Sequence, residues 1–206
     1  MQRGRWLLSV VVVGLVLLTA TFAVGACGSS GGSAGSDLKT YTDADYGYSF
    51  QYPAGWEVQK GDSADVTAGG SAAGSVGVFN PDGAVAGDTY IDLAQVSVYE
   101  LNVTIDESMM PAVKTEVEAV LASLESQASD MKIVEALTET TASGMSGFKV
   151  TYSFSKNGAP ATSTLYFLFT GNIEYQVTLQ AASENWEADK PLFDALLASF
   201  KPGATE

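Results

Sequence analysis

Carboxylates are the main side chains of this sequence that could perform acid–base or metal chemistry. The 206 residues include 24 Asp and Glu and a single cysteine, but no histidine. The absence of histidine excludes imidazole general bases, Ser–His and Cys–His nucleophile pairs, and histidine metal sites. One cysteine cannot form an intramolecular disulfide or a thiolate zinc site. We therefore expect a protein without a cofactor that is not an enzyme.

Three short stretches place two acidic residues close together. They are Asp43 with Asp45, Asp82 with Asp88, and Asp106 with Glu107. A calcium loop needs several carboxylates and carbonyls around a sharp turn, and neither 43–47 nor 80–88 has the twelve-residue pattern that closes with glutamate. No spacing singles out the two acids that glycoside hydrolysis requires. We expect no metal site, and an envelope hydrolase that acts through carboxylates alone stays an alternative.

The single cysteine, Cys27, follows a segment typical of exported proteins. Arg3 and Arg5 precede a long apolar run, and small residues come after it, which is the order of regions in a secretory signal peptide. Positions 24–27 read Val-Gly-Ala-Cys and resemble the processing site of bacterial lipoproteins. The resemblance implies that residues 1–26 are a signal peptide and that acyl chains such as palmitate on Cys27 anchor the chain in the cell membrane. An uncleaved membrane helix and an ordinary free thiol remain alternatives.

The residues after the cysteine predict a spacer between the membrane and a folded domain. Residues 28–36 are glycine, serine and alanine only, a composition that behaves as a flexible chain spanning roughly 15–20 Å. We assign residues 27–40 to the lipidated cysteine and tether, 41–202 to one domain, and 203–206 to a tail. The domain is then expected on the extracytoplasmic face of the membrane.

The charge of the chain limits its partners. The formal net charge is −14, and a field of this sign repels phosphate backbones and anionic lipid surfaces. We therefore expect no nucleic-acid partner, and membrane contact only through the lipid on Cys27.

Hydrophobic periodicity predicts an α+β fold in which helices pack on an antiparallel sheet. Alternation of Tyr48, Phe50 and Tyr52 with polar residues indicates a half-buried strand, and Asn157-Gly158 indicates a tight hairpin turn. Further strands are expected near 56–58, 76–80, 90–99, 132–140, 147–155, 162–170 and 173–181, and helices within 104–128 and over 189–200.

The helix expected within 104–128 has the clearest pattern. Its apolar residues recur at helical spacing and predict a face turned toward the core: Val113, Val117, Val120, Leu121 and Leu124. Asp106 or Ser108 can cap its start, and Pro111 is compatible only with its first turn.

The two ends of the predicted domain resemble the PsbP-like family. The opening reads YGYSFQYPAGW, and the closing segment reads YQVTLQAASENWEADKPLFDALLASF. The matching positions are Tyr52, Pro53, Trp56, Trp186, Phe193, Ser199 and Phe200. The domain is also similar to actinobacterial surface lipoproteins of the LpqN type. The resemblance implies a central antiparallel sheet between helices and little chemistry, and members of the family act by binding other proteins.

Five aromatic residues near these ends could form a contact surface, because aromatic side chains concentrate at binding sites. They are Tyr46, Tyr48, Tyr52, Trp56 and Trp186. Packing in the core and at the sheet edge is the alternative. Together these observations predict a membrane-anchored, non-enzymatic module that binds an envelope protein or a small ligand. A purely structural envelope lipoprotein remains possible.

Overall fold

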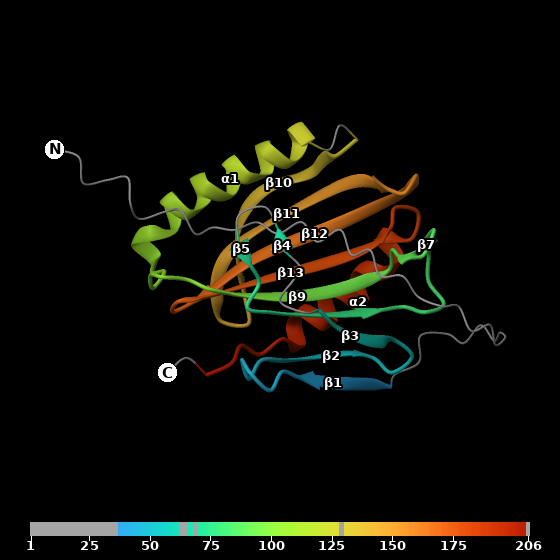
Figure 1. Ribbon diagram of the computed structural model, residues 1–206, viewed down its shortest axis with the longest axis horizontal. Helices are drawn as coiled ribbons and strands as arrows, with labels where there is room; N and C mark the ends of the chain where they lie inside the picture. Colours follow the sequence, from blue (N-terminus) through green and yellow to red (C-terminus); the bar gives the residue numbers. More distant parts are fainter. Residues whose placement is uncertain (1–36, 62–65, 68–69, 128–129, 205–206) are drawn as a thin grey trace.

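The computed structural model describes residues 37–61, 66–67, 70–127 and 130–204 (Figure 1). The predicted signal peptide 1–26, Cys27 and the glycine- and serine-rich segment 28–36 lie outside this part of the chain. Neither α-helix of the described residues combines the length and hydropathy needed to cross a bilayer.

A seven-stranded antiparallel sheet forms the centre of the domain, with the order β10-β11-β12-β13-β9-β6-β3. Its strands are β3 (Glu57–Gly61), β6 (Gly74–Phe79), β9 (Leu93–Glu100), β10 (Lys132–Ala142), β11 (Met145–Lys156), β12 (Ala159–Thr170) and β13 (Ile173–Ala182). The remaining strands form three small hairpins: β1 (Leu38–Thr42) with β2 (Ser49–Pro53), β4 (Val66–Thr67) with β5 (Gly70–Ser71), and β7 (Val85–Ala86) with β8 (Thr89–Tyr90). Two helices complete the predicted α+β fold: α1 (Met110–Gln127), preceded by a 3-10 turn η1 (Glu107–Met109), and α2 (Trp186–Ser199).

The second half of the sheet is a meander whose tight turns set its register. Asn157 and Gly158 both have positive φ, 50° and 87°, as expected for a two-residue turn of type I′. This turn joins β11 to β12, so the predicted hairpin is confirmed. The interior of β12 is buried on both faces, as is typical of a central strand that contains an apolar run such as Leu165–Phe169.

Helix α1 covers one face of this meander (Figure 1). Val113 and Val117 are fully buried and belong to a core cluster with Phe148 and Phe167 of the sheet. Val120, Leu121 and Leu124 pack in the same cluster. The predicted core-facing stripe is therefore confirmed, and Pro111 lies in the first turn of the helix, where no interior hydrogen bond is lost.

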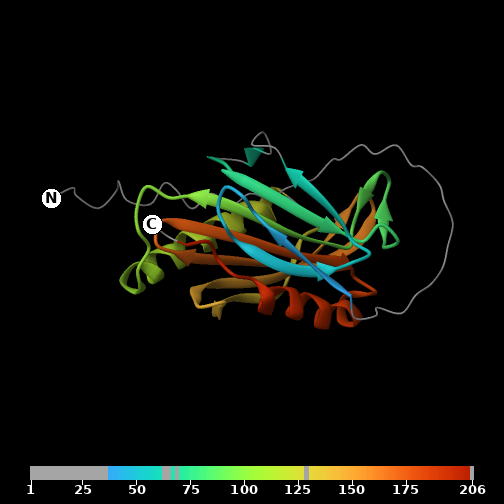
Figure 2. The same cartoon turned by 90° about the horizontal axis from the view of Figure 1, so that it is seen from below.

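Helix α2 and the hairpin β1–β2 cover the opposite face (Figure 2). Phe193 and Phe200 pack there with Tyr48, Phe50 and the sheet. The domain begins earlier than expected, because β1 starts at Leu38 and pairs with β2. The predicted tether 27–40 therefore includes three residues of a strand, and its boundary is corrected to residue 37.

Some predicted elements start up to three residues away from the expected position. The strand expected over 90–99 begins at Leu93, because Asp92 ends a bend that closes the small hairpin β7–β8. Its two carboxylate oxygens accept hydrogen bonds from the backbone N–H of Ala84 (2.8 Å) and of Ala182 (2.9 Å). Helix α2, expected over 189–200, begins at Trp186 and includes Pro191.

Candidate functional site

A groove lies between the beginning of α1 and the closed end of the hairpin β10–β11, and we call it the helix–hairpin groove. It has a volume of about 490 Å³ and adjoins a smaller hollow of about 270 Å³ that shares Glu107, Met110 and Ser146. The larger part is lined by Glu107, Met110, Pro111, Glu139, Thr140, Thr141, Ser146 and Gly147. The smaller part adds Ile105, Asp106, Gly144, Phe169, Thr170 and Gly171.

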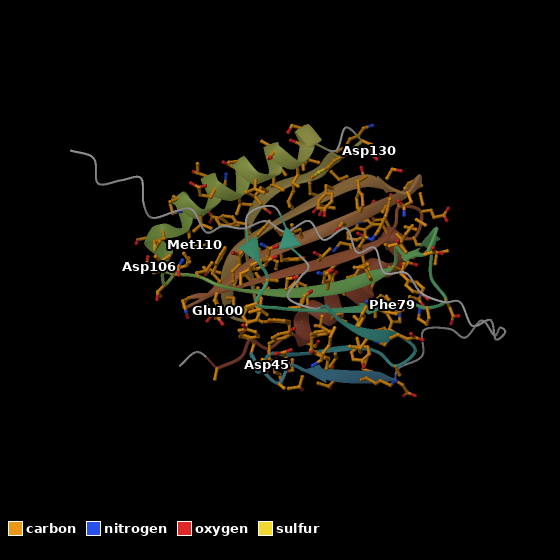
Figure 3. All side chains as sticks on the ribbon, in the orientation of Figure 1. Asp45, Phe79, Glu100, Asp106, Met110 and Asp130 are labelled. Carbon is orange, nitrogen blue, oxygen red and sulfur yellow. The ribbon has the colours of Figure 1, made fainter. Side chains whose placement is uncertain are left out.

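The helical wall of the groove is fixed by a cap at Asp106. Its Oδ1 accepts hydrogen bonds from the backbone N–H of Ser108 (2.9 Å) and from the Ser108 hydroxyl (2.6 Å). These hydrogen bonds hold the pKa of Asp106 below its usual range. Figure 3 shows Asp106 and Met110 together at this end of α1. The acidic pair Asp106 and Glu107 is thus placed at the start of the helix, where a negative charge is favourable.

The strand wall is fixed by a two-residue turn that closes the hairpin. Ser143 and Gly144 have φ of 54° and 81°, and Ala142 pairs with Met145 on either side of them. The Ser143 hydroxyl also donates to the carbonyl of Leu197 in α2 (3.3 Å). The turn at the end of β10 is therefore held both by its own hairpin and by the last turns of α2.

Gly147 lines the groove at a position that leaves no room for a side chain. A Cβ on Gly147 would lie 1.9 Å from the carbonyl oxygen of Phe167, a backbone atom of the neighbouring strand β12. The absence of a side chain at Gly147 allows the backbones of β11 and β12 to approach closely there.

The lining of the groove is acidic and rich in hydroxyl groups. Asp106, Glu107 and Glu139 contribute carboxylates, and neither part of the groove has a lysine or arginine among its lining residues. In the described part of the chain, no group of three or more acidic or cysteine side chains is arranged to hold a metal ion. The arrangement can accept hydrogen bonds and attract a cation. Glu107 and Glu139 come from different elements, which is also the arrangement that a carboxylate pair would need.

A second unusual feature is a buried polar region of the sheet on the α1 side. Glu174 of β13 is fully buried, and its Oε1 accepts a hydrogen bond from Nε2 of Gln176 (2.9 Å). Burial disfavours the charged carboxylate, and the Gln176 hydrogen bond offsets this only partly, so the pKa of Glu174 is raised to about 8. Its Oε2 has no hydrogen-bond partner within the described residues.

This polar region continues onto the neighbouring strands. Nε2 of Gln95 donates to the hydroxyl oxygens of Ser75 and Ser97, both at 3.1 Å, and Nε2 of Gln180 donates to the carbonyl of Ile91 (2.8 Å). Along β13, Glu174, Gln176 and Thr178 alternate with apolar residues, a pattern typical of a strand with one side facing solvent. The structure differs, since Glu174 and Gln176 are buried as well.

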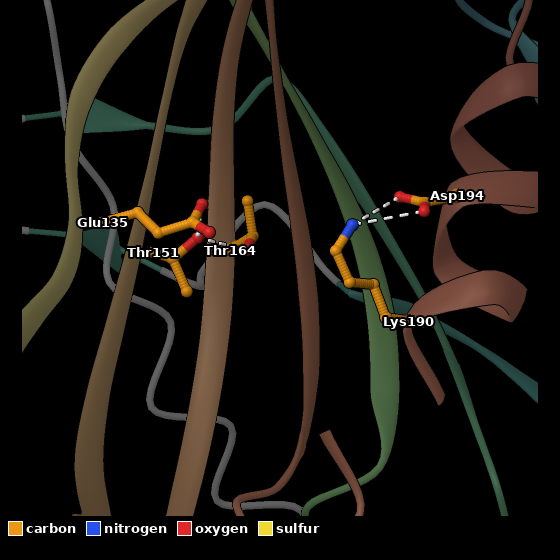
Figure 4. Close-up of polar contacts among 5 residues, drawn as sticks. All are labelled: Glu135, Thr151, Thr164, Lys190 and Asp194. Atoms are coloured by element: carbon orange, nitrogen blue, oxygen red, sulfur yellow. Dashed lines mark hydrogen bonds and ion pairs between the residues drawn. The ribbon is translucent and has the colours of Figure 1, made fainter. Parts of the chain in front are cut away.

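Polar contacts on the other face of the sheet have a structural role (Figure 4). The hydroxyl of Thr151 lies 3.1 Å from Oε2 of Glu135 and 2.8 Å from the hydroxyl of Thr164, linking three adjacent strands. Lys190 and Asp194 form an exposed ion pair one turn apart on α2, and such a pair contributes little to stability.

The five aromatic residues proposed from the sequence do not form one surface. Tyr48 and Tyr52 are 1% and 8% exposed and belong to the core, as the packing alternative expects. Tyr46 is partly buried, and its hydroxyl donates to Oε1 of Glu100 (2.9 Å). Trp56 and Trp186 are also partly buried and flank the ring of Phe193, with ring centroids 6.4 and 5.7 Å from it.

None of these aromatic residues lines the helix–hairpin groove. Of the acidic pairs considered in the sequence, only Asp106 with Glu107 lies there. Glu139 could not be singled out from the sequence, because β10 lies beside the start of α1 only when the sheet has folded.

No protein-family model and no curated protein matches the sequence. Solved structures do share its fold. Cyanobacterial PsbP from Synechocystis sp. PCC 6803 is 19% identical, with a TM-score of 0.54 over 87% of this chain and 98% of that protein. LpqN of Mycobacterium tuberculosis is 13% identical, with a TM-score of 0.50 over 82% of this chain and 91% of that protein. Such low identity is evidence about the fold alone, and the chain has the PsbP-like fold that its two ends implied.

Proposed function

We propose that this protein is a lipid-anchored module on the extracytoplasmic face of the cell membrane that binds an envelope partner and catalyses no reaction. The helix–hairpin groove is the observation that carries the binding role. It is open, it is walled by a capped helix and a tight hairpin, and its lining includes hydroxyls and carboxylates but no amine, thiol or imidazole. The lining therefore has none of the Ser–His, Cys–His or lysine nucleophiles that enzymes commonly use.

The anchor and the location are supported by the lipoprotein-like sequence around Cys27 and by the spacer that follows it. LpqN, which has the same fold, is described as involved in cell envelope biogenesis. Two acyl chains on Cys27 would hold the domain stably at the membrane, where one chain binds only marginally.

Two measurements test this proposal. Intact-mass analysis of the protein from its native host should give a chain that starts at Cys27 and carries acyl chains. An unmodified thiol with residues 1–26 still attached would contradict the anchor.

The binding role is tested by capture from detergent-solubilised envelope with the wild-type protein and with a Cys27→Ala variant. A partner captured by both forms, and shown to bind again after its own purification, supports a binding domain. Hydrolytic turnover that is lost in Glu107→Gln or Glu139→Gln would contradict the non-enzymatic assignment, because it would assign a reaction to the carboxylates of the groove.

A further inference from the structure

The strand β10 has an open edge beside the helix–hairpin groove. It is the outermost strand of the described sheet, with β11 on one side of it. Its pairing with β11 is interrupted between Ile133 and Thr138 by two register shifts and is regular over Thr138–Ala142. Bulges protect an edge from pairing with another strand, so the regular segment Thr138–Ala142 is the part of this edge that another strand could extend.

The direction of the backbone groups in this segment follows from the turn. In a hairpin closed by two residues, the flanking pair, Ala142 and Met145, exchanges both of its hydrogen bonds. Hydrogen-bonded pairs alternate along the ladder, so Thr140 and Thr138 also point their N–H and C=O groups toward β11. The backbone groups of Thr141 and Glu139 consequently point away from the sheet.

The side chains beside this edge are acidic. Glu139 lies opposite Phe148 in the register, and Phe148 packs in the core cluster of α1, so Glu139 and Thr141 lie on the α1 side of the sheet. Glu107, at the start of α1, lines the same groove. Lys149, the basic residue opposite Thr138, lies at an adjacent register position and therefore on the other sheet face.

We propose that an extended segment of a partner protein adds to the sheet along Thr138–Ala142, with lysine or arginine side chains placed against Glu107 and Glu139. Main-chain hydrogen bonds to Glu139 and Thr141 give affinity, and the opposite charges give orientation and specificity. A second copy of this chain fits the edge poorly, because antiparallel pairing of Thr138–Ala142 with itself would place the Glu139 side chains of both copies close together on one sheet face, between two chains of net charge −14 each. This inference rests on the proposed binding function and specifies its partner.

The first test uses a seven-residue peptide of alternating lysine and valine, blocked at both ends, and the full-length protein in a non-ionic detergent. Saturable binding by calorimetry is expected, and it should weaken as salt is added. A peptide with glutamate in place of lysine should not bind. A peptide whose alternate backbone nitrogens are methylated should bind at least about tenfold more weakly, because it cannot donate to the edge.

Variants of the protein locate the site. Thr141→Pro removes an outward N–H without breaking a bond to β11, and proline is accepted on edge strands at such positions, so we expect at least about tenfold weaker binding. Thr141→Ala keeps the N–H and should bind as the wild type does. The double variant Glu107→Gln with Glu139→Gln changes two exposed positions and should weaken binding about three- to tenfold. It keeps the test decisive if Thr141→Pro fails to fold.

Equal binding by wild type, Thr141→Pro and the double variant would overturn the edge proposal. Dimerisation of the wild-type protein that Thr141→Pro abolishes would overturn it too, since the occupant would be a second copy. If the partner captured from envelope binds Thr141→Pro as well as wild type, the edge proposal fails while the binding function stands. If no partner is captured by any form, the binding function itself fails.

Discussion

The side-chain amide of Gln176 donates a hydrogen bond of 2.9 Å to Oε1 of Glu174, whose carboxyl group is fully buried in the sheet. One neutral donor stabilises a carboxylate less than burial destabilises it, so the pKa of Glu174 is raised to about 8. The proton on Glu174 therefore links the stability of the fold to pH.

Glu174→Gln is expected to change how stability depends on pH. Between its ordinary pKa of 4.5 and about 8, the folded chain keeps a proton on Glu174 that the unfolded chain releases. The stabilisation from the protonated carboxyl is thus complete below pH 4.5 and is lost as the pH rises through about 8. Glutamine has the shape of the protonated acid, so the variant should match wild type within about 1 kcal/mol near pH 5 and be more stable, on the order of a few kcal/mol, near pH 9.

Urea unfolding at a series of pH values measures this difference. Glu184→Gln, at an exposed position, is the control for the loss of one negative charge. A difference between wild type and Glu174→Gln that does not change with pH would show that the buried carboxyl titrates no differently in the two states.

Asp92→Ala should strongly destabilise the domain. Asp92 is 4% exposed and accepts the backbone N–H groups of Ala84 and Ala182, which lie in segments far apart in the sequence. Removing the carboxylate leaves two N–H groups without their acceptor, at about 1–3 kcal/mol each. The free energy of unfolding should fall by about 2–6 kcal/mol in a denaturant titration.

Asp82→Ala is the matched control for Asp92, because Asp82 is exposed in the neighbouring turn and takes part there through its backbone N–H. We expect a change within about 0.5 kcal/mol for this variant. Equal losses in the two variants would mean that the Asp92 hydrogen bonds do not hold the bend before β9.

Gly147→Ala should destabilise the hairpin that forms the groove. The added Cβ would lie 1.9 Å from the Phe167 carbonyl oxygen, so β11 and β12 must separate locally. We expect a loss of about 1–3 kcal/mol, the usual cost of overpacking, together with faster amide exchange in the residues on either side. Gly55→Ala, where a Cβ meets no atom within 4 Å, should be close to neutral. A stable Gly147→Ala with unchanged exchange would contradict the close approach of the two strands.

Local patterns in the sequence were sufficient for most elements of the fold. The stripe that includes Val113 and Val117 predicted α1, and Asn157-Gly158 predicted the turn between β11 and β12. Each of these signals acts over a few neighbouring residues, because helix and strand periods and turn conformations are set locally. The processing of residues 1–26 and the lipid on Cys27 remain predictions.

Only the folded chain determined where polar groups are buried and which acids share a groove. The alternation around Glu174 marks a polar side of β13, but whether that side meets water depends on what covers the sheet. Glu107 and Glu139 belong to separate elements, and they line one groove because α1 packs against β11 and β12 and because β10 pairs with β11. The physical reason is that burial and long-range pairing arise from contacts between segments distant in the sequence, which no local period encodes.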